Sequence, residues 1–332
     1  MNILVVDDSA FMRKIITDIL EKMPDIHVCQ QARNGQQALQ IIEKLQPDLI
    51  LLDVEMPVLN GLETLKKIKE QNTIPVVMLS ALTNKETTIE ALALGAADFV
   101  EKPHNITEIQ NEWIKDFYWK IRSVSVQKPL VQESIEAFTL LTKKLPTKIK
   151  AIVVGASTGG PKAILNLVKA LPDSLTMPIF IVQHMPKGFT ASFAQRLNEE
   201  TKVTVCEAEN EMFIKNQVYL CPGDYHMEIK GHQIYLNQNE KIHGTRPAVD
   251  PLFLSAAASF KEELVAILLT GMGKDGTAGM KRIQETGGYT IAQDKETSVV
   301  FGMPRQAIQR GVIDEILSLE EICKKVAQIV RR

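Results

Sequence analysis

A glycine-rich turn that contains one serine follows an apolar run near the middle of the chain. Residues 150–154 have the composition of a buried strand, and residues 155–160 then read Gly-Ala-Ser-Thr-Gly-Gly, with Pro161 suited to open a helix. The spacing fits G-x-S-x-G, in which glycines permit a tight strand-to-helix turn that exposes the serine, here Ser157. The same residues also fit a glycine-rich anion site at a helix N-terminus. The turn alone therefore leaves two interpretations open.

Two further residues follow apolar runs and could activate such a serine. His184 comes just after the run Ile179–Gln183, where an imidazole can take a proton from a serine at a neighbouring strand end. Asp275 follows the run Leu264–Leu269 and could orient the histidine and stabilise its protonated form. Each also has a plainer interpretation, as a hydrogen-bonded structural histidine and as a helix N-cap.

A competing motif overlaps the aspartate. Residues 271–276 read Gly-Met-Gly-Lys-Asp-Gly, so Gly271, Gly273 and Gly276 match the G-x-G-x-x-G turn of dinucleotide-binding domains. Asp294 follows roughly the ~20 residues later that a ribose-binding acid requires. A dinucleotide-dependent oxidoreductase is therefore an alternative function, although it leaves Ser157 without a role.

Acidic, hydroxyl and basic residues also end the apolar runs of the first third of the chain. Asp7 and Asp8 end the first run, Asp53 the third, Ser80 the fourth and Lys102 the fifth. Parallel strands would bring these ends to one edge of a sheet, where ligands bind. Clustered carboxylates favour a hard divalent cation such as Mg²⁺, and an aspartate can form an aspartyl phosphate. The plainer alternative for Asp8 and the serine that follows it is a helix cap.

The pattern of apolar residues predicts two α/β domains. In residues 1–122, strands and helices alternate as five βα units, which predicts a doubly wound parallel sheet. The predicted strands are Ile3–Val6, Val28–Ala32, Leu49–Leu52, Val76–Leu79 and Phe99–Val100. The predicted helices are Phe11–Lys22, Gln36–Leu45, Leu62–Glu70, Lys85–Leu94 and Ile106–Ile121.

A second α/β domain with a mainly parallel sheet is predicted over residues 148–332. Its predicted strands are Ala151–Val154, Ile179–Val182, Val203–Cys206, Val218–Leu220 and Val265–Leu269, with a hairpin-like stretch at Met227–Leu236. Residues 123–147 form a predicted interdomain linker, polar at first and then carrying an apolar stripe of Ile135, Phe138 and Leu141. The stripe fits one docking helix, and a disordered tether is the alternative.

Composition limits the classes of protein to which the chain can belong. It has 332 residues, of which 45% are hydrophobic, and a formal net charge of -2, so bulk charge favours neither nucleic acid nor an anionic membrane. No apolar run approaches the ~20 residues that span a bilayer, and the N-terminus lacks the signal-peptide pattern. The four scattered cysteines indicate reduced thiols. We therefore expect a cytoplasmic protein with no nucleic-acid partner and no direct membrane insertion.

Residues 1–122 resemble a response-regulator receiver domain. The matching segments are Val-Val-Asp-Asp-Ser at 5–9, Leu-Leu-Asp-Val-Glu-Met-Pro at 51–57, Met-Leu-Ser-Ala at 78–81 and Gly-Ala-Ala-Asp-Phe-Val-Glu-Lys-Pro at 95–103. The resemblance implies a flavodoxin-like (βα)5 fold with Asp53 as phosphoacceptor. It implies that Mg²⁺ binds Asp8, Asp53 and the backbone carbonyl of Glu55, and that Lys102–Pro103 is a cis bond. The resemblance also implies that Asp7 lies near the metal, that Ser80 and Lys102 contact the phosphoryl group, and that Phe99 is an aromatic switch residue.

Residues from about 148 resemble the catalytic domain of the chemotaxis protein-glutamate methylesterase/glutaminase (CheB) family. The matching segments are Val-Gly-Ala-Ser-Thr-Gly-Gly-Pro at 154–161, Gln-His-Met-Pro at 183–186, Gly-Phe-Thr at 188–190, Ser-Phe-Ala at 192–194, Arg-Pro-Ala-Val-Asp at 246–250, Leu-Thr-Gly-Met-Gly at 269–273, Asp-Gly at 275–276 and Val-Phe-Gly-Met-Pro-Arg at 300–305. The resemblance implies Ser157 as nucleophile, His184 as general base then acid, and Asp275 as orienting acid. It also suggests the backbone amide of Met272 as an oxyanion donor, with Thr158 beside the nucleophile.

The two resemblances together imply a phosphorylation-activated hydrolase of chemotaxis adaptation. It would demethylate glutamyl methyl esters and deamidate glutamines on the cytoplasmic helices of methyl-accepting chemoreceptors, with a chemotaxis histidine kinase as phosphodonor and no cofactor for the hydrolysis. A phosphorylation-switched binding module with an inert second domain is an alternative from a different class. Two departures from the family pattern are Lys187, beside the expected site, and the aromatic segment 113–119.

Overall fold

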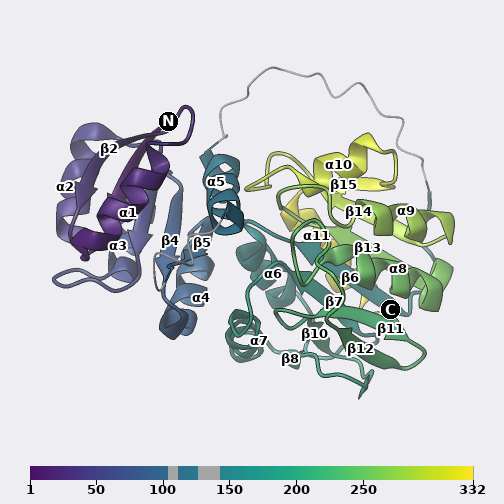
Figure 1. Ribbon diagram of the computed structural model, residues 1–332. Coiled ribbons are helices and arrows are strands. Elements are labelled where there is room, and N and C mark those ends of the chain that lie inside the picture. The colour runs from purple at the N-terminus through teal and green to yellow at the C-terminus, as the bar shows by residue number, and fades with distance from the viewer. Residues whose placement is uncertain (104–110, 126–142, 332) are drawn as a thin grey trace. The chain divides into compact units, whose positions relative to one another are not determined.

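The computed structural model describes residues 1–103, 111–125 and 143–331. The chain divides into two compact units, Met1–Gln132 and Glu133–Arg332 (Figure 1). The apolar stripe predicted at Ile135, Phe138 and Leu141 lies outside the described residues, as does the start of the helix predicted from Ile106.

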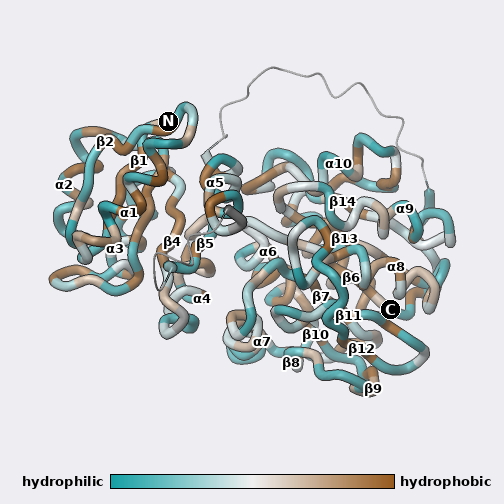
Figure 2. The backbone as a smooth tube through the Cα atoms, viewed as in Figure 1, coloured by the Kyte–Doolittle hydropathy of each residue, from teal (hydrophilic) through white to brown (hydrophobic). Residues whose placement is uncertain are grey.

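The first unit is built on a five-stranded parallel sheet in the order β2-β1-β3-β4-β5. Its strands are β1 (Asn2–Val6), β2 (His27–Ala32), β3 (Leu49–Asp53), β4 (Val76–Ser80) and β5 (Asp98–Glu101). Of the three inner strands, β3 and β4 are buried along their whole length, because helices cover both faces of the sheet. The hydrophobic colour along β1 and β4 in Figure 2 follows from the same burial. The predicted doubly wound fold is confirmed.

The helices of this unit begin at side chains that cap them. They are α1 (Ala10–Leu20), α2 (Gly35–Leu45), α3 (Gly61–Gln71), α4 (Lys85–Leu94) and α5 (Asn111–Ser125), with a 3₁₀ turn η1 (Leu82–Asn84) before α4. Ser9, Asn34 and Asn60 each accept a hydrogen bond from a backbone amide of the first helical turn. Ser9 therefore caps α1 by itself, and the carboxylate of Asp8 stays exposed.

The second unit has a seven-stranded parallel sheet in the order β15-β14-β13-β6-β7-β10-β8. Its strands are β6 (Ala151–Ala156), β7 (Ile179–Gln183), β8 (Val205–Glu207), β10 (Val218–Leu220), β13 (Leu264–Leu268), β14 (Tyr289–Gln293) and β15 (Glu315–Leu317). A separate antiparallel sheet, in the order β11-β12-β9, contains the predicted hairpin; its strands are β9 (Met212–Phe213), β11 (His226–Lys230) and β12 (Gln233–Asn237). The predicted α/β class is confirmed, but β14 and β15 were not predicted, because one mixes polar with apolar residues and the other has three residues.

Strand β6 is the point at which the chain reverses its direction across the large sheet. The chain passes from β6 to β7 on one side, and β13 later pairs with β6 on the other side. Ligands of open α/β sheets bind beside such a switch point, at the carboxyl ends of the strands. The helices that cover this sheet are α6 (Gly160–Lys169), α7 (Phe189–Glu200), α8 (Val249–Phe260), α9 (Thr277–Glu285), α10 (Met303–Gln309) and α11 (Leu319–Ile329), with a 3₁₀ turn η3 (Lys261–Glu263) after α8.

Two expectations about the fold have a plain outcome. The expected cis bond at Lys102–Pro103 is wrong: within the described ranges the cis peptide bond is Arg246–Pro247, and a trans X–Pro bond is the lower-energy form. No helix among the described residues is both long and apolar enough to cross a membrane.

Candidate active site

Ser157 lies directly after β6 in a turn that only small residues can form. Gly159 has a φ of 78°, which favours glycine, and a Cβ atom there would lie 2.5 Å from Cβ of Val299. A Cβ atom on Gly160 would lie 2.0 Å from Oε1 of Gln183. The predicted strand–turn–helix around the serine is present, and its glycines allow the turn to pack closely against its neighbours.

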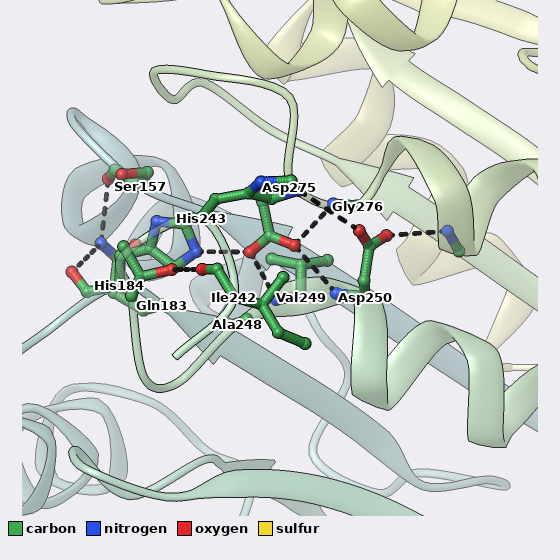
Figure 3. A network of polar contacts seen from close by, with 12 residues as sticks. Ser157, Gln183, His184, Ile242, His243, Ala248, Val249, Asp250, Asp275 and Gly276 are labelled. Atoms are coloured by element: carbon green, nitrogen blue, oxygen red, sulfur yellow. Dashed lines mark hydrogen bonds and ion pairs between the residues drawn. The ribbon is translucent and has the colours of Figure 1, made fainter. Parts of the chain in front are cut away.

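The strands on both sides of β6 bring the other two residues to the same edge of the sheet. His184 directly follows β7, and its backbone amide donates to the carbonyl of Ala156 at 3.1 Å. Asp275 follows β13, and its Oδ2 lies 2.7 Å from Nε2 of His184. Figure 3 shows the imidazole of His184 between Ser157 and Asp275. Within the described residues Oγ of Ser157 makes no hydrogen bond, so the structure joins His184 to Asp275 but not to Ser157. Catalytic hydrogen bonds are often long or poorly aligned without substrate.

The carboxylate of Asp275 is buried and surrounded by donors. It accepts backbone hydrogen bonds from Val249 at 2.6 Å, Asp250 at 3.0 Å and Gly276 at 2.9 Å, besides its contact with His184. Burial acts to raise the pKa of Asp275, but the hydrogen bond and charge of His184 and the amides outweigh it and lower that pKa. Because an ionised carboxylate only accepts hydrogen bonds, Nε2 of His184 carries the hydrogen and Nδ1 keeps the lone pair.

The loop after β13 packs against the serine through Gly271, the residue before Met272. A Cβ atom on Gly271 would lie 2.8 Å from Cβ of Ser157. The carbonyl of Gly271 accepts from the amides of Gly302 and Met303 at 3.1 and 2.8 Å. Since the two groups of a trans peptide point in opposite directions, the Met272 amide points away from these donors. That amide has no acceptor among the residues that the structure describes. Thr158, the residue after Ser157, is buried.

The residues of the dinucleotide motif have other roles in this structure. Gly271 packs against Ser157, and the carboxylate of Asp275 is occupied by His184 and three amides. The carboxylate of Asp294 accepts from the backbone amide and the hydroxyl of Thr297 within its own turn. The geometry therefore favours the hydrolase interpretation of this loop over a ribose-binding one.

Asp250, which no prediction assigned to the site, lies next to Asp275 at the start of α8 (Figure 3). Its Oδ1 accepts from the amide of Gly279 at 2.8 Å, and its Oδ2 lies 4.0 Å from Nε2 of His243. Burial is the largest cause that raises the pKa of Asp250 to about 6, and the negative charge of Asp275 adds to it, while the Gly279 amide, His243 and the Gly276 amide act to lower that pKa. The signal available in the sequence was its place in the Arg-Pro-Ala-Val-Asp segment.

The titration of Asp250 predicts a pH dependence of stability. Its pKa is higher in the folded chain than the ordinary 3.8, so the folded state holds the proton more tightly. The resulting stabilisation is present below about pH 4 and is lost as the pH rises through about 6. Between pH 4 and 7 the wild type should lose on the order of 1–3 kcal/mol relative to Asp250→Asn, measured by urea unfolding. A constant difference between the two proteins, with His243→Gln as a control for the neighbouring titration, would contradict the assignment.

The carboxyl edge of the smaller sheet gathers the predicted acidic residues. Single carboxylate oxygens of Asp7, Asp8 and Asp53 lie within 4.8 Å of one another. Nζ of Lys102 lies 2.7 Å from Oδ2 of Asp7 and 2.7 Å from Oδ2 of Asp53. Burial and the charge of Asp7 raise the pKa of Asp53 to about 6, although Lys102 and the Glu55 amide lower it.

These acids fit a hard divalent cation. Oδ2 of Asp7 is buried and, apart from its ion pair with Lys102, has no hydrogen-bond partner among the described residues. An exposed carboxylate on Asp8 and a buried one on Asp53 complete an all-oxygen donor set, which Mg²⁺ prefers. Lys102 supplies positive charge to two of these carboxylates, Asp7 and Asp53.

Two other predicted receiver residues contact different groups in this structure. Oγ of Ser80 lies 2.6 Å from Oγ1 of Thr88 and donates to the carbonyl of Ala81, so the structure joins it to the start of α4 and not to Asp53. Phe99 is buried, and Nζ of Lys120 lies 5.4 Å from its ring centre. In the aromatic segment 113–119, which differs from the family pattern, the ring of Trp113 stacks on that of the buried Phe117, with 4.8 Å between the ring centres.

Comparisons with known proteins agree with both halves of this description. The family model described as CheB methylesterase matches residues 152–326, and the response regulator receiver domain matches residues 3–113. A protein-glutamate methylesterase/protein-glutamine glutaminase from Pyrococcus abyssi is 42% identical, over 99% of this chain and 94% of its own length. The chain belongs to the CheB methylesterase family. The relative of the same name from Thermotoga maritima is 40% identical over 99% of this chain and 98% of its own length.

A solved structure extends the relationship of this CheB family member to the fold. The crystal structure of the CheB methylesterase catalytic domain from Thermotoga maritima is 42% identical, with a TM-score of 0.54. It matches 55% of this chain and 100% of its own. The second unit therefore has the fold of a CheB catalytic domain, and the first belongs to the receiver family.

Proposed function

We propose that this protein is a phosphorylation-activated hydrolase that demethylates glutamyl methyl esters and deamidates specific glutamines on chemoreceptors during chemotaxis adaptation. The names of its relatives support this activity and substrate class. The observation that carries the proposal is the 2.7 Å contact between His184 and the buried Asp275, at the switch point where Ser157 follows the central strand β6. The domains are a receiver at 1–122, a linker at 123–147 and a catalytic domain at 148–332.

The first half of the reaction forms an acyl-enzyme. Oγ of Ser157 attacks the side-chain carbonyl carbon of the methyl ester or amide, and its proton moves to Nδ1 of His184. Asp275 holds the imidazole through Nε2 and stabilises its protonated form. His184 then returns the proton to the leaving group, so the carbon–oxygen or carbon–nitrogen bond breaks and methanol or ammonia departs.

The second half releases the product. Nδ1 of His184 takes a proton from water, the resulting hydroxide attacks the acyl carbon, and the proton returns to Oγ of Ser157 as its bond to carbon breaks. A glutamate carboxylate is left on the receptor. The amide of Met272, with Thr158 beside the nucleophile, stabilises the oxyanion of both tetrahedral intermediates, where one donor contributes about 3–4 kcal/mol. No cofactor takes part in this chemistry.

The receiver would regulate this activity through Asp53. We assign Asp53 as the phosphoacceptor, with a chemotaxis histidine kinase as phosphodonor in the cytoplasm. Asp8, Asp53 and the backbone carbonyl of Glu55 would hold Mg²⁺, with Asp7 nearby, and the ion would neutralise phosphoryl oxygens. Lys102 would move from its two carboxylates to the phosphoryl group, Ser80 would turn from Thr88 to donate to it, and Phe99 would report the change.

Methanol release from a methylated receptor cytoplasmic fragment tests both domains. A small-molecule phosphodonor with Mg²⁺ should raise the rate for wild type by about 5–150-fold, the usual range of allosteric coupling. Asp53→Asn keeps the shape but lacks the nucleophilic carboxylate, so its rate should not respond. A response in Asp53→Asn equal to that of wild type would contradict the phosphoacceptor assignment. Asp48→Asn, a surface acid at the other end of β3, is the matched control.

A further inference from the structure

Two buried side chains that the mechanism above does not use make hydrogen bonds to the turn that carries Ser157, one from the side of each neighbouring strand. Gln183 is the last residue of β7 and is 2% exposed, and Thr270 follows β13 and is 1% exposed. Buried polar side chains are retained where their hydrogen bonds are made, because an unpaired polar group in the interior is costly. The partners of these two side chains therefore indicate what they do.

The side chain of Gln183 connects the backbones of Ser157 and His184. Its Nε2 donates to the carbonyl of Ser157 at 2.9 Å and to the carbonyl of His184 at 3.1 Å. The opposite orientation of the amide would place its oxygen against two carbonyl oxygens, so the orientation is determined by these contacts. Its Oε1 is buried without a partner among the described residues. The side chain of Gln183 therefore makes two hydrogen bonds to these carbonyls while its own carbonyl oxygen stays unpaired among the described residues.

Thr270 holds the same turn from the side of β13. Its carbonyl accepts from the amide of Ser157 at 3.0 Å, and its Oγ1 donates to the carbonyl of Thr158 at 2.9 Å. The hydroxyl in turn accepts from the amide of Val300 at 2.9 Å. The Thr270 amide donates to Oε1 of the buried Gln293 at 2.8 Å, which links the network to the end of β14.

We propose that Gln183 and Thr270 are positioning residues that fix the nucleophile turn relative to His184. Gln183 holds the carbonyl of Ser157, and Thr270 holds the carbonyl of Thr158. Each carbonyl shares a planar peptide with the following amide, so the direction of the amide after the nucleophile is fixed as well. In G-x-S-x-G hydrolases that amide faces the oxyanion. The inference rests on the proposed function of Ser157, and it assigns to these two side chains the geometry that the reaction needs.

Thr270→Val tests the hydroxyl at nearly constant shape, and Thr270→Ser restores it. A misplacement of about 1 Å can cost about 100-fold, so we expect kcat of Thr270→Val to fall by about 10- to 100-fold with KM changed by less than about threefold. Thr270→Ser should recover most of this loss. Thr290→Val is the matched control, because the buried hydroxyl of Thr290 likewise donates to a carbonyl, that of Val312, at 2.9 Å and accepts from an amide, that of Asp314, at 3.0 Å. It lies near the start of β14, away from the carboxyl edge.

Gln183→Leu removes the hydrogen bonds from the Gln183 amide to the carbonyls of Ser157 and His184. It also tests the proposal if Thr270→Val does not fold. We expect it to lower kcat by a similar factor of about 10 to 100. Gln233→Leu is its control, since Gln233 also donates its side-chain amide to a carbonyl, that of Glu211, at 2.9 Å, but in the separate antiparallel sheet. Thermal unfolding of every variant shows that each protein is folded at the assay temperature.

The rate constant for phosphonylation of Ser157 by a fluorophosphonate separates the possible failures. Slower labelling of Thr270→Val and Gln183→Leu, with unchanged labelling of the two controls, supports the proposal. Wild-type labelling rates in both variants would overturn it, and so would an equal loss in Thr290→Val and Gln233→Leu. If wild type is labelled but releases no methanol, the proposed substrate is wrong and the labelling rates still decide the positioning role. If Ser157 of the folded wild type is not labelled, both proposals fail.

Discussion

Ser157→Ala is expected to reduce methanol release from methylated receptor by about 10⁴- to 10⁶-fold, which is below detection in most assays. Alanine removes the attacking oxygen, so the acyl-enzyme can no longer form at residue 157. The loss should appear in kcat for both the ester and the amide substrate, because both pass through the same intermediate. The turn itself should survive, since its hydrogen bonds are made by the backbone of residue 157.

The control for this substitution is Ser174→Ala, an exposed serine in the loop between α6 and β7 of the same unit. It should match wild type in turnover and in thermal stability. Activity of Ser157→Ala within tenfold of wild type would remove the serine from the mechanism. In that case the anion-site interpretation of the glycine-rich turn would be the one to pursue.

Asp275→Asn is expected to lower kcat by about 10³- to 10⁴-fold, as loss of the orienting acid does in other triads. The wild-type carboxylate accepts from Nε2 of His184 and from three amides. A carboxamide has one accepting oxygen, so its NH₂ group must face either the amides or the imidazole. Facing the imidazole, it would reverse the tautomer and leave Nδ1 protonated, so His184 could no longer act as base.

The effect of Asp275→Asn on catalysis must be separated from its effect on folding, because the residue is buried among backbone donors. His184→Gln leaves Asp275 and its three amide partners in place, and we expect it to lose at least as much activity. Turnover by both variants within tenfold of wild type, in proteins that unfold at the wild-type temperature, would exclude the triad. Loss in Asp275→Asn alone would instead assign the aspartate a structural role.

The sequence by itself indicated most of the strands, though not β14 and β15, and the edge of each sheet at which the candidate residues lie. Apolar runs of strand length, each followed by a helical pattern, are a local signal, and consecutive βα units require parallel strands. The carboxyl ends of parallel strands meet at one edge, so Ser157, His184 and Asp275 were expected on the same side of one sheet, and Asp7, Asp53 and Lys102 on the same side of the other. The glycines around Ser157 carried their own local signal, because the turn tolerates no Cβ atom at Gly160.

The tertiary structure decided which strand ends are neighbours and what each side chain contacts there. The order β13-β6-β7 is a matter of pairing between segments far apart in the chain, and no local pattern encodes it. That order favours the hydrolase interpretation of the loop at 271–276 over the dinucleotide one, and it places Nε2 of His184 against Asp275. The hydrogen bond from Gln183 to Ser157 joins residues 26 apart in the chain, and the one from Thr270 to Thr158 joins residues 112 apart. Such contacts exist only once the strands are paired, which is why a glutamine and a threonine without a distinctive local pattern acquire a role only in the folded chain.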